Sequence, residues 1–119
     1  VPTLGEGTGS SDEPEFVHTV RQTVEQHLSD PDFTVQELAR EVAVSRSTLY
    51  RRLKSETGQT PSAFIRQVRL EYGARLLKEG TGTVSEVAYA VGFNSLTYFG
   101  ESFRKHVGVP PSEYAEKET

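Results

Sequence analysis

Apolar side chains recur every three or four residues along most of the chain, which is the spacing of helices that are buried on one side. The first such stripe consists of Phe16, Val20, Val24 and Leu28. The segment at residues 29–33, with two aspartates and a proline, ends this helix. Further stripes of the same spacing follow, and together they predict an all-α fold of about seven helices.

Signals for the start and end of helices support this division. Thr34 and Glu37 have the spacing of a capping box, in which the two side chains satisfy free amides at a helix start. Ser45 is a favourable N-cap for the next helix, whose buried side is marked by leucines and which ends before Gly58. The sequence therefore predicts two short helices between residues 34 and 58.

A longer helix follows. Thr60 suits the N-cap position and Pro61 the first helical turn, and the apolar stripe then continues as far as Gly80. The 19 residues between them would form a helix about 28 Å long. Adjacent major grooves on one face of DNA are ~34 Å apart, so such a helix could hold two groove-binding elements in neighbouring grooves.

The second half of the chain repeats the first. Residues 83–91 match residues 34–42 at five of nine positions, and residues 95–114 match residues 45–64 in their leading serine and in the placement of apolar residues, glycine and proline. Each copy has the pattern of a helix-turn-helix, with small residues where the two helices cross and turn. Such helix pairs also occur as plain corners of bundles, but two tandem copies favour DNA binding.

Charge is distributed unevenly. The chain carries 13 basic and 17 acidic residues, a net charge of −4, yet residues 1–44 carry −7 and residues 45–119 carry +3. The basic part can approach phosphate groups. We interpret the acidic face of residues 12–41 as a solvated surface, with contact to a receiver domain or a polymerase subunit as the alternative.

Composition excludes several classes of function. The absence of cysteine excludes disulfides, thiolate zinc sites and a cysteine nucleophile. His18, His27 and His106 are too far apart to ligate a metal from one helix, and no serine lies in a GxSxG sequence. No apolar run approaches the ~20 residues of a membrane span. We expect no metal, no cofactor and no enzymatic activity.

Five segments carry a distinctive combination of residues: SRSTLYRRLK at 45–54, GQTPSAF at 58–64, VAYAVGF at 87–93, SLTYF at 95–99 and GVPPSEY at 108–114. Together they resemble the C-terminal DNA-binding domain of the AraC/XylS family of bacterial transcription regulators. The sequence of these segments is similar to that of output domains of hybrid two-component sensors. The resemblance implies two helix-turn-helix units joined by a long linker helix within residues 12–119. Residues 1–11, rich in glycine and serine, are expected to be a flexible linker from an upstream domain.

The resemblance also implies the function. The chain is expected to bind a specific double-stranded DNA site through the major groove. It would be part of a cytoplasmic regulator that controls transcription, more often by activating it than by repressing it. Its expected partners besides DNA are RNA polymerase and an upstream receiver or sensor domain. The absence of methionine, even at position 1, indicates a piece of a longer protein, whose parent could be membrane-anchored.

The resemblance carries over DNA contacts by position. In the first unit they are Arg46, Ser47, Thr48, Tyr50 and Arg51; in the second they are Ser95, Leu96, Thr97, Tyr98, Glu101, Arg104 and Lys105. Arg51 is the strongest candidate for a base contact, because arginine can bridge O6 and N7 of guanine for about 1–3 kcal/mol of discrimination. Arg46, Arg104 and Lys105 are expected near phosphates.

Some positions depart from the family pattern. Glu101 stands where the family often has a basic residue, so it either accepts a hydrogen bond from cytosine N4 or leaves the second unit mainly as an anchor; we favour the anchor. Gly73 replaces a common alanine and is expected to weaken the long helix by up to about 1 kcal/mol, which would permit bending. Arg69 is expected to be structural. The alternative for the whole chain is a helical protein-interaction module without DNA binding.

Overall fold

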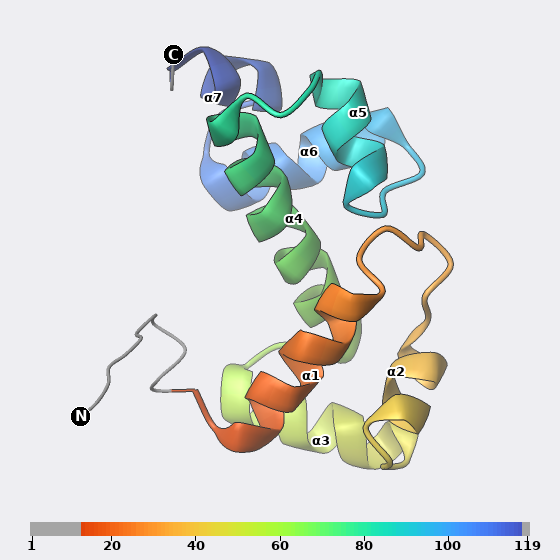
Figure 1. The fold of residues 1–119 in the computed structure, drawn as a ribbon. Helices are drawn as coiled ribbons and strands as arrows, with labels where there is room; N and C mark the ends of the chain where they lie inside the picture. The colour runs from red at the N-terminus through yellow and green to blue at the C-terminus, as the bar shows by residue number, and fades with distance from the viewer. Residues whose placement is uncertain (1–12, 118–119) are drawn as a thin grey trace, which may run out of the picture.

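The computed structural model describes residues 13–117, and within that range the chain forms seven helices and no strand (Figure 1). They are α1 (Glu15–Gln26), α2 (Val35–Glu41), α3 (Arg46–Thr57), α4 (Pro61–Glu79), α5 (Val84–Ala90), α6 (Leu96–Val107) and α7 (Pro111–Lys117). The predicted all-α fold with two helix-turn-helix units and a long linker helix is confirmed. The linker expected at residues 1–11 lies outside the described residues.

Local capping explains where the helices begin and end. Complete capping boxes start α2 and α5: the amide of Glu37 donates to Thr34 Oγ1 at 3.1 Å, and Thr83 and Glu86 repeat the arrangement. Side chains of serine or threonine also cap α3, α4 and α6, each accepting from the amide three residues ahead. Glycines with positive φ end these same three helices.

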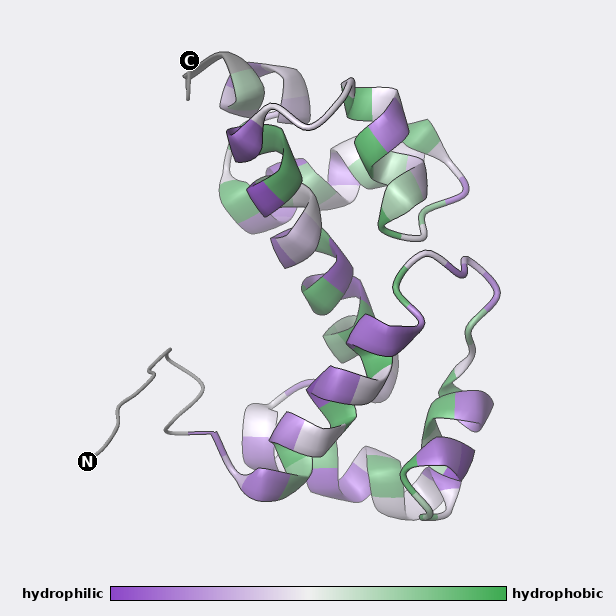
Figure 2. Cartoon of the chain, in the orientation of Figure 1, coloured by the Kyte–Doolittle hydropathy of each residue, from purple (hydrophilic) through white to green (hydrophobic). Residues whose placement is uncertain are grey.

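The long helix α4 joins two separate cores. In Figure 1 it runs between α1–α3, which surround its first half, and α5–α7, which surround its second half. Phe64, Ile65 and Val68 of α4 enter the first core, whereas Leu70 and Leu77 enter the second. Each helix carries both hydrophilic and hydrophobic residues (Figure 2), as expected for helices packed on one side.

The two turns have the same backbone path. Val44 donates to the carbonyl of Ala39 at 3.1 Å, and in the second unit Phe93 donates to that of Ala88 at 3.0 Å. Ala39 and Ala88 are both buried, as the small residues at the helix crossings predict. The repeat seen in the sequence is therefore a structural repeat.

Arg69 of α4 connects the two units. Its side chain is buried, and its Nη1 donates to the carbonyls of Leu28 at 2.7 Å and Val91 at 2.9 Å, while Nη2 donates to that of Asp30 at 2.9 Å. Burial lowers the pKa of the guanidinium below its ordinary value, and the charge of Asp30 opposes this shift. The arginine thus ties the loop after α1 to the turn of the second unit, the structural role expected for it.

The expectation of bending at Gly73 is not supported. Gly73 is buried within a continuous α4, and a Cβ added there would lie 3.2 Å from Cε1 of Phe99. The glycine lets α6 approach α4 closely. The packing between the two helices therefore offsets its cost in helix propensity.

Candidate nucleic-acid interface

The outward face of α3 carries most residues expected to contact DNA in the first unit. Arg46, Ser47, Tyr50 and Arg51 are exposed, with half of the Tyr50 side chain accessible. Thr48 is only partly exposed, and its hydroxyl accepts a hydrogen bond from Ser45 Oγ at 2.9 Å. The structure therefore brings four of the five residues together on an open face and places the fifth in the N-terminal cap.

Two adjacent arginines of α3 point in different directions. The guanidinium of Arg52 lies 3.8 Å from the ring centre of Phe16 and 3.5 Å from the Glu56 carboxylate. The Arg52 side chain therefore packs on α1, although 42% of it stays exposed. Arg51 has no hydrogen-bond or ion-pair partner in the described part of the chain, so its five donors remain available.

Each unit has a surface hollow beside its second helix. In the first unit Arg46, Ser47 and Tyr50 line a hollow of about 470 Å³ together with Thr60 and Pro61. The hollow of the second unit, about 740 Å³, is lined by the equivalent Leu96, Thr97, Gly100, Pro110 and Pro111, and also by Glu101, Arg104, Lys105 and Gly108. The repeat therefore presents two equivalent surfaces with different chemistry.

Three equivalent pairs account for most of the chemical difference. Leu96, which is 42% exposed, stands in place of Arg46, Gly100 in place of Tyr50, and Glu101 in place of Arg51. Glu101 forms no salt bridge within the described residues. Positive charge in the second unit comes instead from Arg104 and Lys105, further along α6. The first unit is thus equipped to donate to bases, and the second offers apolar contact and one acceptor.

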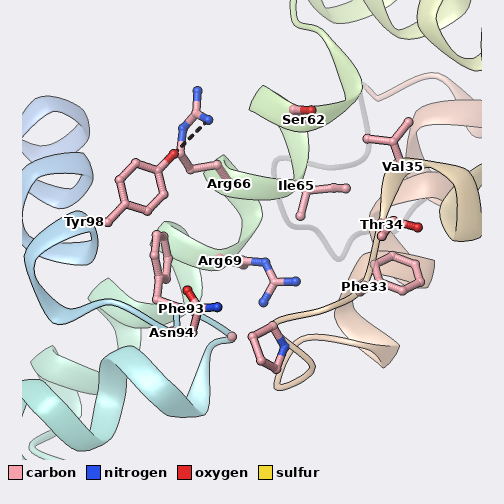
Figure 3. Close-up of a pocket in the computed structure, with 12 residues that line it drawn as sticks. Phe33, Thr34, Val35, Ser62, Ile65, Arg66, Arg69, Phe93, Asn94 and Tyr98 are labelled. Atoms are coloured by element: carbon pink, nitrogen blue, oxygen red, sulfur yellow. Dashed lines mark hydrogen bonds between the residues drawn. The ribbon is translucent and has the colours of Figure 1, made fainter.

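Two residues expected in the second interface make contacts elsewhere. The hydroxyl of Ser95 accepts from the amide of Tyr98 at 3.1 Å and caps α6. Tyr98 turns toward α4, where its hydroxyl accepts from Arg66 Nη1 at 3.3 Å (Figure 3). Ser95 thus serves as a helix cap, whereas Tyr98, still 47% exposed, faces α4. Arg66, which the sequence pattern did not single out, joins this surface.

Tyr98 and Arg66 border a hollow between the two units. This central hollow has a volume of about 300 Å³ and is lined by Pro31, Phe33, Thr34, Val35, Ser62, Ile65, Arg66, Arg69, Gly92, Phe93, Asn94 and Tyr98. Figure 3 shows the contribution of α4 on one side of it and that of the α5–α6 turn on another. The hollow is therefore built by both units and exists only while they keep their mutual arrangement.

Two similar helix-turn-helix units, each with an exposed second helix and joined by one long helix, define a tandem helix-turn-helix DNA-binding domain. A family model described as "Helix-turn-helix domain" matches residues 38–117. A putative AraC-like transcription regulator of Streptomyces lividans is 39% identical over 87 residues, 73% of this chain and 29% of that protein. The chain belongs to the AraC/XylS family and is the DNA-binding domain of a transcription regulator.

Further comparisons agree. Histidine kinase P4 of Formosa agariphila is 34% identical over 115 residues, which are 97% of this chain and 8% of that protein. The DNA-binding domain of AdpA, solved in complex with a target DNA, superposes with a TM-score of 0.76 at 32% identity over 89% of this chain and 93% of that one. The chain thus spans less than a third of the two curated relatives. No helix among residues 13–117 is long and apolar enough to cross a bilayer.

Proposed function

We propose that the domain recognises a bipartite duplex site in which the first unit reads bases and the second contributes mainly anchoring. The observation that carries this proposal is the unpaired, exposed guanidinium of Arg51 on the outward face of α3. The equivalent position of α6 carries the carboxylate of Glu101 instead. Arginine is the commonest reader of guanine, whereas a carboxylate repels phosphate and can only accept from cytosine N4 or a similar donor.

The other exposed residues have roles that follow from their chemistry. Ser47 and Tyr50 lie beside Arg51 and contact base edges, while Arg46 near the start of α3 contacts phosphate. In the second unit Leu96 offers apolar contact to a thymine methyl group and Thr97 a hydroxyl. Arg104 and Lys105 neutralise phosphates. Thr48 and Ser95 act through their caps, which hold the reading helices in place.

The parent protein is proposed to be a signal-responsive regulator of the two-component type that activates transcription. The match of almost the whole chain to a small part of a histidine kinase supports an output module attached to an upstream sensor or receiver. Activation would require contact with RNA polymerase, for which the acidic surface of residues 13–41 is available. A domain with this role acts where the chromosome is, on the cytoplasmic side of any membrane that anchors its parent.

The proposal can be tested by selecting the domain against a randomised duplex pool about three helical turns long and titrating the selected duplex against salt. Two short blocks about one turn apart, with a steep salt dependence, would show that both units read bases. One block flanked by sequence-independent contacts is the expected result. Lack of enrichment, with weak binding even at low salt, would contradict the proposal and favour a protein-interaction role for the acidic surface.

A further inference from the structure

The central hollow lies between the two candidate reading surfaces. It shares Val35 and Ser62 with the hollow beside α3, so the two hollows adjoin. Its opposite side is formed by Asn94 and Tyr98, at the start of α6. A duplex that placed α3 and α6 in successive major grooves would have to pass its intervening backbone across this surface.

The charge of this surface suits a polyanion. No carboxylate lines the central hollow, although the chain as a whole carries more acidic than basic residues. A neighbouring hollow that shares Arg66 and Tyr98 also lacks a carboxylate and adds Lys105 and His106. Among the described residues, neither of these two hollows is lined by a carboxylate, although Asp30, beside Pro31, is near enough for its charge to act on Arg69.

Arg66 and Arg69 are both in the central hollow, but only one is available to a ligand. The guanidinium of Arg69 is used by the carbonyls of Leu28, Asp30 and Val91. Arg66 donates to the phenol of Tyr98 and forms no salt bridge in the part of the chain that the structure describes. An arginine oriented by a neutral hydroxyl keeps most of its donors for a phosphate.

We propose that the central hollow is a phosphate-binding seat for the DNA backbone between the two half-sites, with Arg66 as the principal contact and the hydroxyls of Ser62 and Tyr98 beside it. The inference rests on the proposed function, since it assumes that both units lie on one duplex. It assigns Tyr98 to the backbone rather than to a base. Contact at this point is independent of base sequence, and it fixes the distance along the duplex between the segments that the two units cover, which are the half-sites meant here.

The protein side of the seat is tested with Arg66→Gln on the duplex that the wild-type domain selects. We expect affinity to fall about tenfold for all sequences alike, as for loss of one charged hydrogen bond, and the slope of log affinity against log salt to shrink by about one. Arg75→Gln is the matched control. Arg75 lies nine residues along α4, on its opposite side, and its guanidinium is 4.6 Å from the ring centre of Tyr72. This variant should change neither quantity.

The DNA side of the seat is tested on the wild-type domain with duplexes that carry one neutral methylphosphonate at successive positions. Affinity should fall when the substitution lies in the backbone between the half-sites, and Arg66→Gln should lose nothing further on that duplex. Sensitive phosphates only within the half-sites, or an Arg66→Gln domain with unchanged affinity and salt slope, would overturn the seat while leaving the proposed function intact. A wild-type domain that binds no duplex would overturn the proposed function itself. If Arg66→Gln fails to fold by circular dichroism, the methylphosphonate series decides alone.

Discussion

The guanidinium of Arg69 occupies the space that a side chain at Gly92 would need. A Cβ on Gly92 would collide with Arg69 Nη1 and with the carbonyl oxygen of Leu28, which that nitrogen contacts. The turn itself does not exclude a Cβ, because the equivalent residue of the first unit is Ala43, with a φ of 62°. The glycine at position 92 is therefore required by the loop after α1 and by the arginine that joins the two units.

Replacing Gly92 with alanine should destabilise the domain by at least about 3 kcal/mol. The change adds a Cβ at a φ of 93° and displaces a buried arginine from its carbonyl partners. Urea unfolding followed by circular dichroism measures the loss. Gly100→Ala is the matched control: a Cβ there meets no atom within 4 Å, so this helical substitution should be neutral or stabilise by up to about 1 kcal/mol. A small cost for Gly92→Ala would contradict the proposed steric relationship.

Arg69→Lys should also cost about 3 kcal/mol or more, although it keeps the charge. One ammonium cannot reach three carbonyls on both sides of the linker helix as the planar guanidinium does, and carbonyls left buried without a donor are costly. The double variant with Gly92→Ala should lose less unfolding free energy than the sum of the two single losses, because both changes break the same contact. Strictly additive unfolding free energies would show that the two residues act independently.

The elements of the fold were predictable because their signals are local. A threonine and a glutamate three residues apart satisfy each other's backbone amides, so Thr34 and Thr83 mark helix starts without knowledge of the tertiary structure. The exposed face of α3 followed from the same reasoning, since the leucines fix its buried side. Repetition of the pattern made the second unit as predictable as the first.

What the sequence could not predict depends on partners distant along the chain. The carbonyls that hold Arg69 lie 22 to 41 residues away, and Tyr98 lies 32 residues from Arg66. By helix propensity alone Gly73 is an unfavourable residue. Its packing role could not be predicted, because the Phe99 ring next to it belongs to another helix. The packing of Arg52 on Phe16 is likewise a contact between distant parts of the chain, since Phe16 lies on α1. The sequence did offer one signal for Arg66: it lies outside the apolar stripe of α4, which places it on the surface.

Stability at high pH should depend on Tyr72. Burial raises the pKa of its phenol above the ordinary value of 10, and the Glu25 carboxylate raises it further, while Arg75 has the opposite effect. The pKa of Tyr72 is higher in the folded than in the unfolded state. Its contribution to the free energy of unfolding is therefore complete below about pH 10 and is lost as the pH rises through the pKa of the folded state. The unfolding free energy of the wild type minus that of Tyr72→Phe should be constant from pH 7 to 9 and fall above pH 10. Parallel curves to pH 11 would contradict this assignment.

Arg51→Ala should weaken binding to the selected duplex by about 1–3 kcal/mol and relax the preference at a single base pair, because one bidentate contact to guanine would be lost. The neighbouring Arg52→Ala removes the same charge from the same helix but acts on the packing against Phe16. It should lower thermal stability and leave base preference unchanged. Competition among duplexes that differ at one position distinguishes the two. Equal effects of both variants on base preference would remove Arg51 from its proposed role.

The role of the second unit depends on Glu101, which is exposed and occupies the position equivalent to Arg51. Glu101→Arg should tighten binding about tenfold at low salt and steepen the salt slope by about one, because a repelling carboxylate becomes a phosphate contact. Glu101→Gln should give an intermediate affinity. Glu15→Arg on α1 changes the net charge equally but far from α6, so it separates a local contact from long-range attraction. If Glu101→Arg gains no more affinity than Glu15→Arg, α6 does not lie in a groove, and the domain binds DNA through its first unit alone.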